Sequence, residues 1–231
     1  MHLKDVLLET TNEATMNSEP NLDNKFKTAI IVGIICTILT ILLISLIIYL
    51  IKRKYKNNNQ EVELFQEKIT NELKEFSSNY NLTFFEKQTL TLNKKNKVRF
   101  NIPNAIVSQY GILFVEPIYS NNENIEANCV SRTWIRHHKK RDIQFPNPLL
   151  NLNSTIKNFS LIISDGIPVV GLYIIDSSME KIELYNQPQH IVFADSIDLK
   201  TTLKNIFIEL KKQLEKPIDI NVIVQQIMDA K

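Results

Sequence analysis

An uninterrupted apolar segment of 24 residues, Thr28 to Ile51, constrains the fold of this chain more than any other feature. The segment contains no charged residue and no proline, and its only polar interior side chains are those of Thr37, Thr40 and Ser45. At about 1.5 Å per residue, a helix of this length extends roughly 36 Å, which exceeds the hydrocarbon core of a bilayer. A helix buried in a soluble core would normally keep a polar stripe. The sequence therefore predicts one transmembrane helix over residues 28–51.

Two other membrane-directed signals do not fit this segment. The apolar run of a cleavable signal peptide is about 7 to 15 residues long and lies near the start of the chain, whereas this run is longer and begins at Thr28. Cys36 follows Ile35 in the middle of the run, so it does not match the acylated cysteine of a lipoprotein, which follows a small residue at the end of such a run.

The charges that flank the segment predict its orientation. Lys52, Arg53, Lys54 and Lys56 follow it, whereas only Lys25 and Lys27 lie close before it. Because Lys and Arg concentrate on the cytoplasmic side of a span, the carboxyl side is expected in the cytoplasm. The predicted arrangement is a polar tail 1–27 outside the cell membrane, the span 28–51, a basic linker 52–60 and a cytoplasmic domain 61–231.

Composition excludes several classes of site. The chain has 27 Lys and Arg against 25 Asp and Glu, and this balance does not by itself indicate a nucleic-acid binder. Cys129 is the one cysteine outside the apolar segment, so no disulfide framework is expected. With four glycines in all, neither a P-loop nor a dinucleotide-binding fingerprint can be written, and no nucleotide cofactor is predicted.

Residues 61–231 have the length of one domain and alternate between helical and strand patterns. Apolar residues at steps of three and four predict helices, and short runs rich in β-branched and aromatic residues predict strands. The predicted order is a helix over 62–76, strands over 82–91, 97–108, 111–119 and 125–135, a basic loop, a helix over 149–163, strands over 169–175 and 190–194, a helix from 196 to 210 and a short helix from 219 to 228. This order predicts a single α/β domain.

Four short motifs follow one another between Glu61 and Ala194. They are NAIVSQYGILFVE (residues 104–116), NIEA (124–127), Trp134 followed by NPLLN (147–151), and IPVVGLYII (167–175). In this order they resemble the nuclease-related domain (NERD) family of the PD-(D/E)xK nuclease-like superfamily. The first motif is similar to a family pattern in which an acidic residue is followed by a strand, a turn that contains glycine, and a second strand that ends in glutamate. The second stands at the place of the family's Gly-x-Ile-x-Gly turn, and the third resembles its tryptophan and Asn-Pro-Leu-x-Gln. The resemblance implies a PD-(D/E)xK-like mixed sheet flanked by helices.

The resemblance also implies metal-assisted hydrolysis of a phosphodiester, in which two carboxylates hold Mg²⁺ and a lysine two residues after the second one assists the attacking water. At these positions the chain has Asn104, Glu116 and Ile118, and Asn151 replaces the family glutamine. Glu116 is thus the retained candidate metal ligand, which a first-helix glutamate, Glu61 or Glu63, could assist. Because one carboxylate and the lysine are missing, we expect catalysis to be strongly impaired. No cofactor is expected, except Mg²⁺ if the site is active.

A basic run between two predicted elements is a second candidate site. It surrounds Trp134, His137 and His138 and consists of Arg132, Arg136, Lys139, Lys140 and Arg141. The run is consistent either with a patch for phosphate or anionic lipid or with a solvated loop. Adjacent histidines on a strand point to opposite faces, so a metal shared by His137 and His138 is not expected. Trp134 is expected in the core.

Three functions follow from these features. The first is a membrane-anchored, degenerate nuclease-related protein that binds nucleic acid or a protein partner without efficient cleavage. The second is an active membrane-tethered, Mg²⁺-dependent nuclease. The third is a structural subunit of an envelope complex, for which the span is the functional part.

Overall fold

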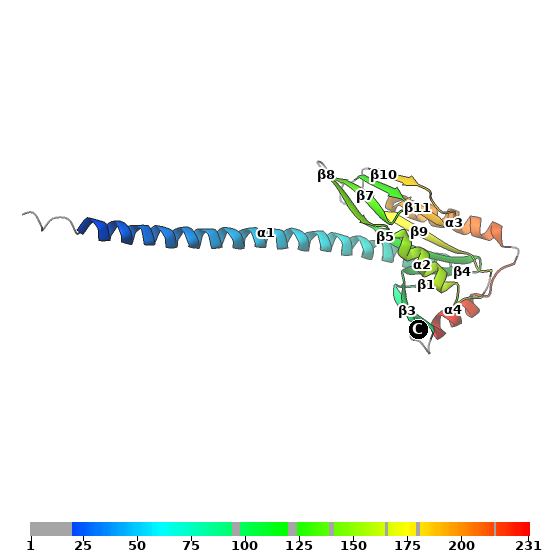
Figure 1. Ribbon diagram of the computed structural model, residues 1–231. Helices are drawn as coiled ribbons and strands as arrows, with labels where there is room; N and C mark the ends of the chain where they lie inside the picture. The colour runs from blue at the N-terminus through cyan, green and yellow to red at the C-terminus, as the bar shows by residue number, and fades with distance from the viewer. Residues whose placement is uncertain are drawn as a thin grey trace, which may run out of the picture. The chain divides into compact units, whose positions relative to one another are not determined.

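The structure is a computed structural model that describes residues 20–93, 98–119, 124–138, 141–164, 166–178, 181–214 and 216–231. Most of the polar tail, residues 1–19, lies outside the described residues. The chain divides into two units, Met1–Gln60 and Glu61–Lys231, and the strands of the described residues all lie in the second unit. Figure 1 shows the order of the elements along the chain.

Helix α1 (Pro20–Asn79) contains the apolar segment. Among the described residues it is the one helix long and apolar enough to cross a membrane. The large apolar side chains from Ile30 to Ile51 are each 47 % to 65 % exposed, as expected for a helix that faces lipid on every side. Residues 52–60, which were expected to form a linker, are helical instead. No proline or glycine lies in this stretch to end the helix.

The domain 61–231 is built on a mixed five-stranded sheet, which confirms the predicted α/β class. The strand order is β1 (Thr83–Phe85), β4 (Asn104–Ser108), β5 (Gly111–Ile118), β9 (Val169–Ile175) and β11 (Ile191–Asp195). The first three strands are antiparallel neighbours, whereas β5, β9 and β11 are parallel. The apolar runs of β5 and β9 are buried on both faces, as is usual for central strands covered by helices.

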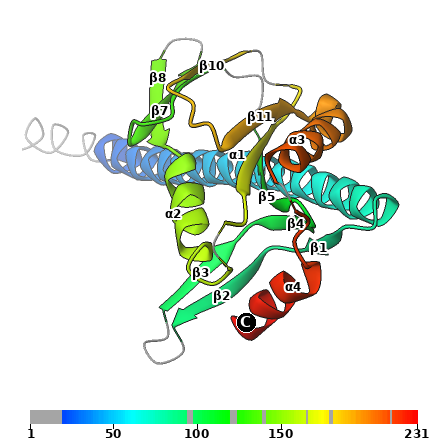
Figure 2. The ribbon, with the colours of Figure 1, turned by 90° about the vertical axis from the view of Figure 1, so that its right-hand side faces the viewer.

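Helices cover both faces of this sheet (Figure 2). On one face, the end of α1 and α3 (Leu199–Gln213) pack their apolar side chains against Ile106, Leu113 and Val115. On the other face, α2 (Leu149–Phe159) packs against Phe114, whose ring lies edge-on to that of Phe159 at 4.9 Å. Successive residues of β5 therefore contribute to two separate cores.

Two smaller sheets complete the domain. One has the order β10 (Lys181–Tyr185), β6 (Asn124–Asn128), β7 (Thr133–His138) and β8 (Arg141–Pro146), and the other pairs β2 (Gln88–Asn93) with β3 (Val98–Ile102). A 3-10 turn, η1 (Ser196–Asp198), precedes α3, and α4 (Ile220–Asp229) lies beside the β2–β3 hairpin, where Thr91 N donates to Ala230 O (Figure 2).

Several predicted strand boundaries were wrong. The predicted strand 97–108 is two strands, because Pro103 has no N–H to donate to a ladder. The predicted strand 125–135 is likewise divided by a turn between β6 and β7, and the predicted strand 82–91 is divided at Glu86 and Lys87. The predicted basic loop is the β7–β8 hairpin. From Asp142 to Pro146, the residues of β8 alternate between exposed and partly buried, and the polar residues of the hairpin masked the strand signal.

Candidate functional site

A polar cleft of about 460 Å³ lies beside the end of β5 and the start of α2. We call it the Glu116 cleft. Its walls combine one carboxylate, one ammonium group, amides, hydroxyls and two rings; the lining residues include Lys87, Phe100, Asn101, Glu116, Asn151, Ser154, Thr155, Asn158 and Tyr173. Its volume is typical of sites that bind small molecules, about 300–1,000 Å³.

The Glu116 side chain lines this cleft from the face of the sheet that it shares with Tyr173. It is the parallel partner of Tyr173 on β9, and Tyr173 is almost fully buried. Burial raises the pKa of the Glu116 carboxyl, and the nearby Lys87 ammonium lowers it by a smaller amount. The same burial, with the Glu116 charge, raises the pKa of Tyr173, whose hydroxyl donates to Pro148 O at 3.0 Å. Glu116 is therefore a partly desolvated carboxyl with one cation beside it.

Lys87 is the site residue that the sequence analysis missed. It lies between β1 and β2, far from the motif in sequence, and its exposed side chain supplies the positive charge that Ile118 cannot. Nothing in the spacing of the motif indicates this position. The one available signal was the isolated pair Glu86-Lys87 that divides the predicted strand 82–91.

Asn104 does not point into the Glu116 cleft. It is the antiparallel partner of Val115, so it shares the face of Val115, and Glu116 points to the opposite face. The residue is only 8 % exposed, and both polar atoms of its amide are hydrogen-bonded: Oδ1 accepts from Lys87 N at 3.0 Å, and Nδ2 donates to Thr70 Oγ1 at 2.9 Å. Asn104 is thus a structural residue that ties α1 and the β1–β2 connection to the sheet.

A second hollow, of about 390 Å³, lies on the α1 side of the same strands. Glu116 and Lys87 line both hollows, whereas Asn104 and the helix glutamates Glu63 and Glu67 line only the second. Of the two first-helix candidates, Glu63 thus lies near the motif. The Glu61 carboxylate instead accepts a hydrogen bond from Tyr119 Oη at 2.8 Å.

Ile118 and Asn151 have different surroundings. Ile118 lines neither hollow and packs against the apolar core beside α2. Asn151 is exposed at the start of α2 and lines the Glu116 cleft. In the same motif the buried Asn147 is structural, since its Nδ2 donates to Cys129 O and Ser131 O and its Oδ1 accepts from Leu149 N.

These residues do not fit the Mg²⁺ site implied by the resemblance. Among the described residues that line the cleft, Glu116 is the one carboxylate, and the Asn104 side chain lies on the other face of the sheet, where its oxygen accepts from Lys87 N. Among the described residues, no group of three or more His, Cys, Asp or Glu side chains could hold a metal ion. Mg²⁺ prefers octahedral oxygen coordination with carboxylates.

The basic run does not form one patch in the described residues. Arg132 is exposed in the turn before β7, and Arg141 is exposed at the start of β8. Arg136 is partly buried, with its guanidinium 4.9 Å from the centre of the Phe145 ring. Lys139 and Lys140 lie outside the described residues. Trp134 is 1 % exposed, which confirms its predicted place in the core.

His137 lies on an acidic surface of the β6–β8 sheet. Its Nδ1 is 2.8 Å from an Asp142 carboxylate oxygen, and its Nε2 is 3.8 Å from a Glu126 oxygen. An anion approaching the outer face of β7 would therefore meet carboxylates as well as the imidazole.

The Glu116→Gln variant should change how stability depends on pH. A carboxyl whose folded-state pKa is raised above the usual value of 4.5 binds a proton more tightly in the folded state, so the wild type loses stability as pH rises from 4.5 to the folded pKa. Glu116→Gln removes that loss, and its stability relative to wild type should increase with pH across this window. Urea unfolding followed by fluorescence of the single tryptophan, Trp134, measures the difference.

Two further variants test whether the pH dependence comes from the Glu116 carboxyl. Lys87→Ala should extend the window to higher pH, because it removes the charge that lowers the pKa of Glu116. Asp198→Asn, at an exposed carboxylate that lines neither hollow, is the control for the loss of one carboxylate. A stability difference between wild type and Glu116→Gln that is constant from pH 4 to 8 would show that the Glu116 carboxyl is not desolvated.

Comparison of the chain with protein-family models, with curated proteins and with solved structures finds no match.

Proposed function

We propose that this chain is a single-pass membrane protein whose domain 61–231 is a degenerate nuclease-related domain that binds single-stranded nucleic acid in the Glu116 cleft without cleaving it. The span would be 28–51, with the domain in the cytoplasm, as the flanking positive charges favour. The observation that carries the proposal is the division of the motif between two faces: Glu116 points into the cleft, whereas Asn104 points away from it.

The mixed sheet supports the relation to the nuclease-like superfamily. The antiparallel β4–β5 hairpin carries the motif, Glu116 lies near the end of its second strand, and helices flank both faces. If the β4–β5 register is continued by one residue, Pro103 lies opposite Glu116. The Pro103 side chain has no oxygen or charge to replace the missing aspartate. A phosphodiester bound here would therefore meet one carboxylate and one ammonium group.

The lining of the cleft favours a nucleotide unit over a flat protein surface. Asn101, Asn151 and Asn158 supply amides, which can pair with the edges of an unstacked base. The partly exposed Phe100 ring can stack on a base, and the Lys87 ammonium can pair with a phosphate. Residues 61–231 contain 20 Lys and Arg and 20 Asp and Glu, so attraction to a long polyanion should be weak.

This charge balance predicts a shallow salt dependence. If Lys87 makes the one phosphate contact, the slope of log K against log salt for a single strand should be about −0.7. Lys87→Gln should bring the slope near zero, and Asn151→Ala should weaken binding roughly fivefold, the effect of one lost neutral hydrogen bond. Fluorescence anisotropy of a labelled oligonucleotide, with the full chain in phosphatidylcholine nanodiscs, measures both.

Lys157→Gln is the matched control, because Lys157 is an exposed lysine of α2 that does not line the cleft. It should leave the affinity and the slope near their wild-type values. Unchanged affinity in both Lys87→Gln and Asn151→Ala would rule out the Glu116 cleft as the binding site.

A further inference from the structure

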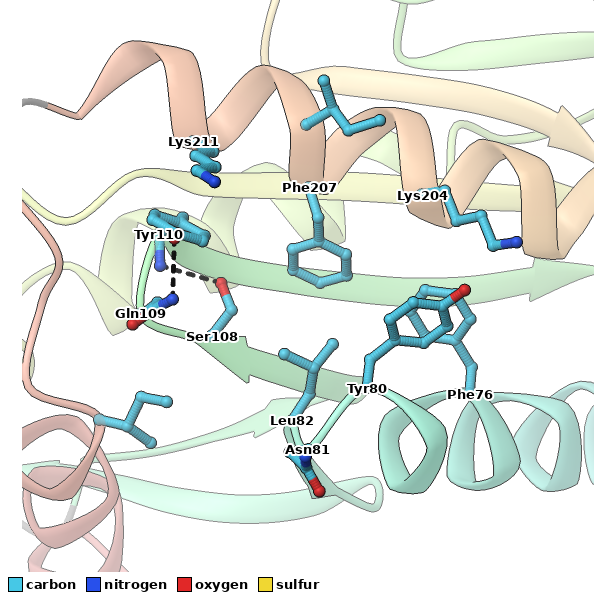
Figure 3. A pocket seen from close by; sticks show the side chains of 12 residues that line it. Phe76, Tyr80, Asn81, Leu82, Ser108, Gln109, Tyr110, Lys204, Phe207 and Lys211 are labelled. Carbon is cyan, nitrogen blue, oxygen red and sulfur yellow. Dashed lines mark hydrogen bonds between the residues drawn. The ribbon is translucent and has the colours of Figure 1, made fainter.

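A second hollow site, of about 580 Å³, lies elsewhere in the domain and has a different chemistry (Figure 3). It is formed where the end of α1, the turn between β4 and β5, and α3 meet, and it shares no lining residue with the Glu116 cleft. Most of its surface is apolar, with Phe76 and Phe207 lining it between α1 and α3. We call it the α1–α3 hollow.

Aromatic rings form the apolar part of this hollow. The centroid of the Phe76 ring lies 4.5 Å from that of Tyr80 and 6.2 Å from that of Phe207, and the Phe76 and Phe207 rings are inclined by only 17°. Phe76 is buried, whereas Tyr80 and Ile208 are 48 % and 53 % exposed. The hollow thus exposes apolar side chains, and burying them against a ligand would be energetically favourable.

The charged side chains that line the hollow, among the described residues, are two lysines. Lys204 and Lys211 both lie on α3. Their Nζ atoms lie 5.8 Å from the Tyr80 ring centroid and 5.7 Å from the Tyr110 ring centroid, respectively. Two carboxylates of α1 and α3 are paired with other lysines: Glu75 with Lys200 at 3.0 Å and Glu209 with Lys212 at 2.6 Å. Asp219, next to the lining residue Ile220, caps α4 by accepting a hydrogen bond from Asn221 N. The hollow therefore complements a negative charge.

The two lysines lie seven residues apart, which places them two turns apart on the same side of α3, with a rise of about 10.5 Å between them. Phe207 lies between them in sequence and points into the hollow (Figure 3). We infer that the α1–α3 hollow binds an amphiphilic anion with an acyl chain. The chain packs against Phe76 and Phe207, and the acidic head group pairs with the ammonium group of Lys204 or Lys211. This inference concerns a site separate from the Glu116 cleft and does not depend on the function proposed for it.

Photolabelling tests the inference without competing detergent. The full chain, in nanodiscs of phosphatidylcholine alone, is irradiated with dodecanoate that carries a diazirine, and labelled peptides are identified by mass spectrometry. Label is expected on the segments that line the hollow, around Tyr80, Tyr110 and Phe207. Excess unlabelled dodecanoate should remove it.

The Lys204→Gln/Lys211→Gln variant should lower labelling roughly tenfold or more, as expected for the loss of a charge-assisted contact. The two single variants then identify the lysine that holds the head group.

Two matched controls keep the test specific. Lys157→Gln/Lys216→Gln removes two lysines that do not line the hollow and should leave the labelling unchanged. At the half-exposed Ile208, Ile208→Glu places a carboxylate in the lining and should abolish labelling, whereas Ile208→Gln has the same size without the charge and should largely retain it. Trp134 fluorescence verifies that each variant is folded.

The source of the anion is distinguished by the probe. Labelling by the free dodecanoate assigns a fatty-acid site, and labelling by photoreactive phosphatidylglycerol in the nanodisc assigns a site for a membrane lipid. The inference is overturned if neither probe labels the hollow, if a photoreactive dodecanol labels it as efficiently as dodecanoate, or if labelling persists in Lys204→Gln/Lys211→Gln and in Ile208→Glu.

Discussion

Gly111→Ala is expected to lower the free energy of unfolding of the domain 61–231 by roughly 2–5 kcal/mol, the sum of backbone strain and overpacking. Gly111 has a φ of +147°, which side-chain-bearing residues rarely adopt. A Cβ at this position would also lie 2.8 Å from Pro168 O. That carbonyl accepts from Ile112 N at 2.9 Å, so it cannot move away without disturbing the start of the β5–β9 pairing.

Gly166→Ala is the matched control for this substitution. Gly166 also has a positive φ, +82°, but no heavy atom lies within 4 Å of a Cβ built on it. The control should therefore show only the strain, about 1–2 kcal/mol. Urea unfolding followed by Trp134 fluorescence gives both values. Equal losses in the two variants would show that the contact with Pro168 does not constrain the β4–β5 turn.

Trp134→Ala is expected to lower the free energy of unfolding by about 3–5 kcal/mol, as for other buried aromatic residues truncated to alanine. The ring lies 6.0 Å from that of Phe145 on β8 and 6.3 Å from that of Phe193 on β11, so it links the four-stranded sheet to the five-stranded one. Its Nε1 donates to Asn128 O at 3.1 Å, and the variant leaves that carbonyl without this donor.

Because Trp134 is the only tryptophan, this variant is best measured by proteolysis of the full chain in increasing urea. Trp134→Phe keeps an aromatic ring between the two sheets and should lose less stability. Leu161→Ala removes a side chain that is 69 % exposed and should stay within about 0.5 kcal/mol of wild type. A Trp134→Ala variant as stable as Leu161→Ala would contradict the packing of the two sheets through this residue.

Where one pattern dominates, the sequence predicted the fold well. The apolar segment around Ile44 permits only a membrane-spanning or fully buried helix, and the short apolar run of β5 favours a strand that is covered on both faces. Strands such as β8 and β10 were missed because tertiary pairing, rather than their own polar residues, holds them in the sheet. Pairing of β10 with β6 joins residues far apart in the chain, and a local pattern carries no signal for it.

Much less of the candidate site could be predicted. Glu116 and Asn151 line one cleft, but the face of Asn104 depends on the β4–β5 register. The turn at Gly111 sets that register, and a register shift of one residue would move the Asn104 side chain to the opposite face of the sheet. Lys87 could not be found from spacing, because it reaches Glu116 from a connection between two other strands.

A cleavage assay tests whether the domain binds a single strand without cutting it. End-labelled single-stranded DNA and RNA are incubated with the full chain in phosphatidylcholine nanodiscs, with Mg²⁺ or Mn²⁺, and both the bound fraction and strand length are followed. We predict that the strand binds, that binding depends on Lys87, and that its length does not change. Fragments that appear in wild type and disappear in Glu116→Gln would contradict the proposal, because they would show that the Glu116 carboxylate takes part in cleavage.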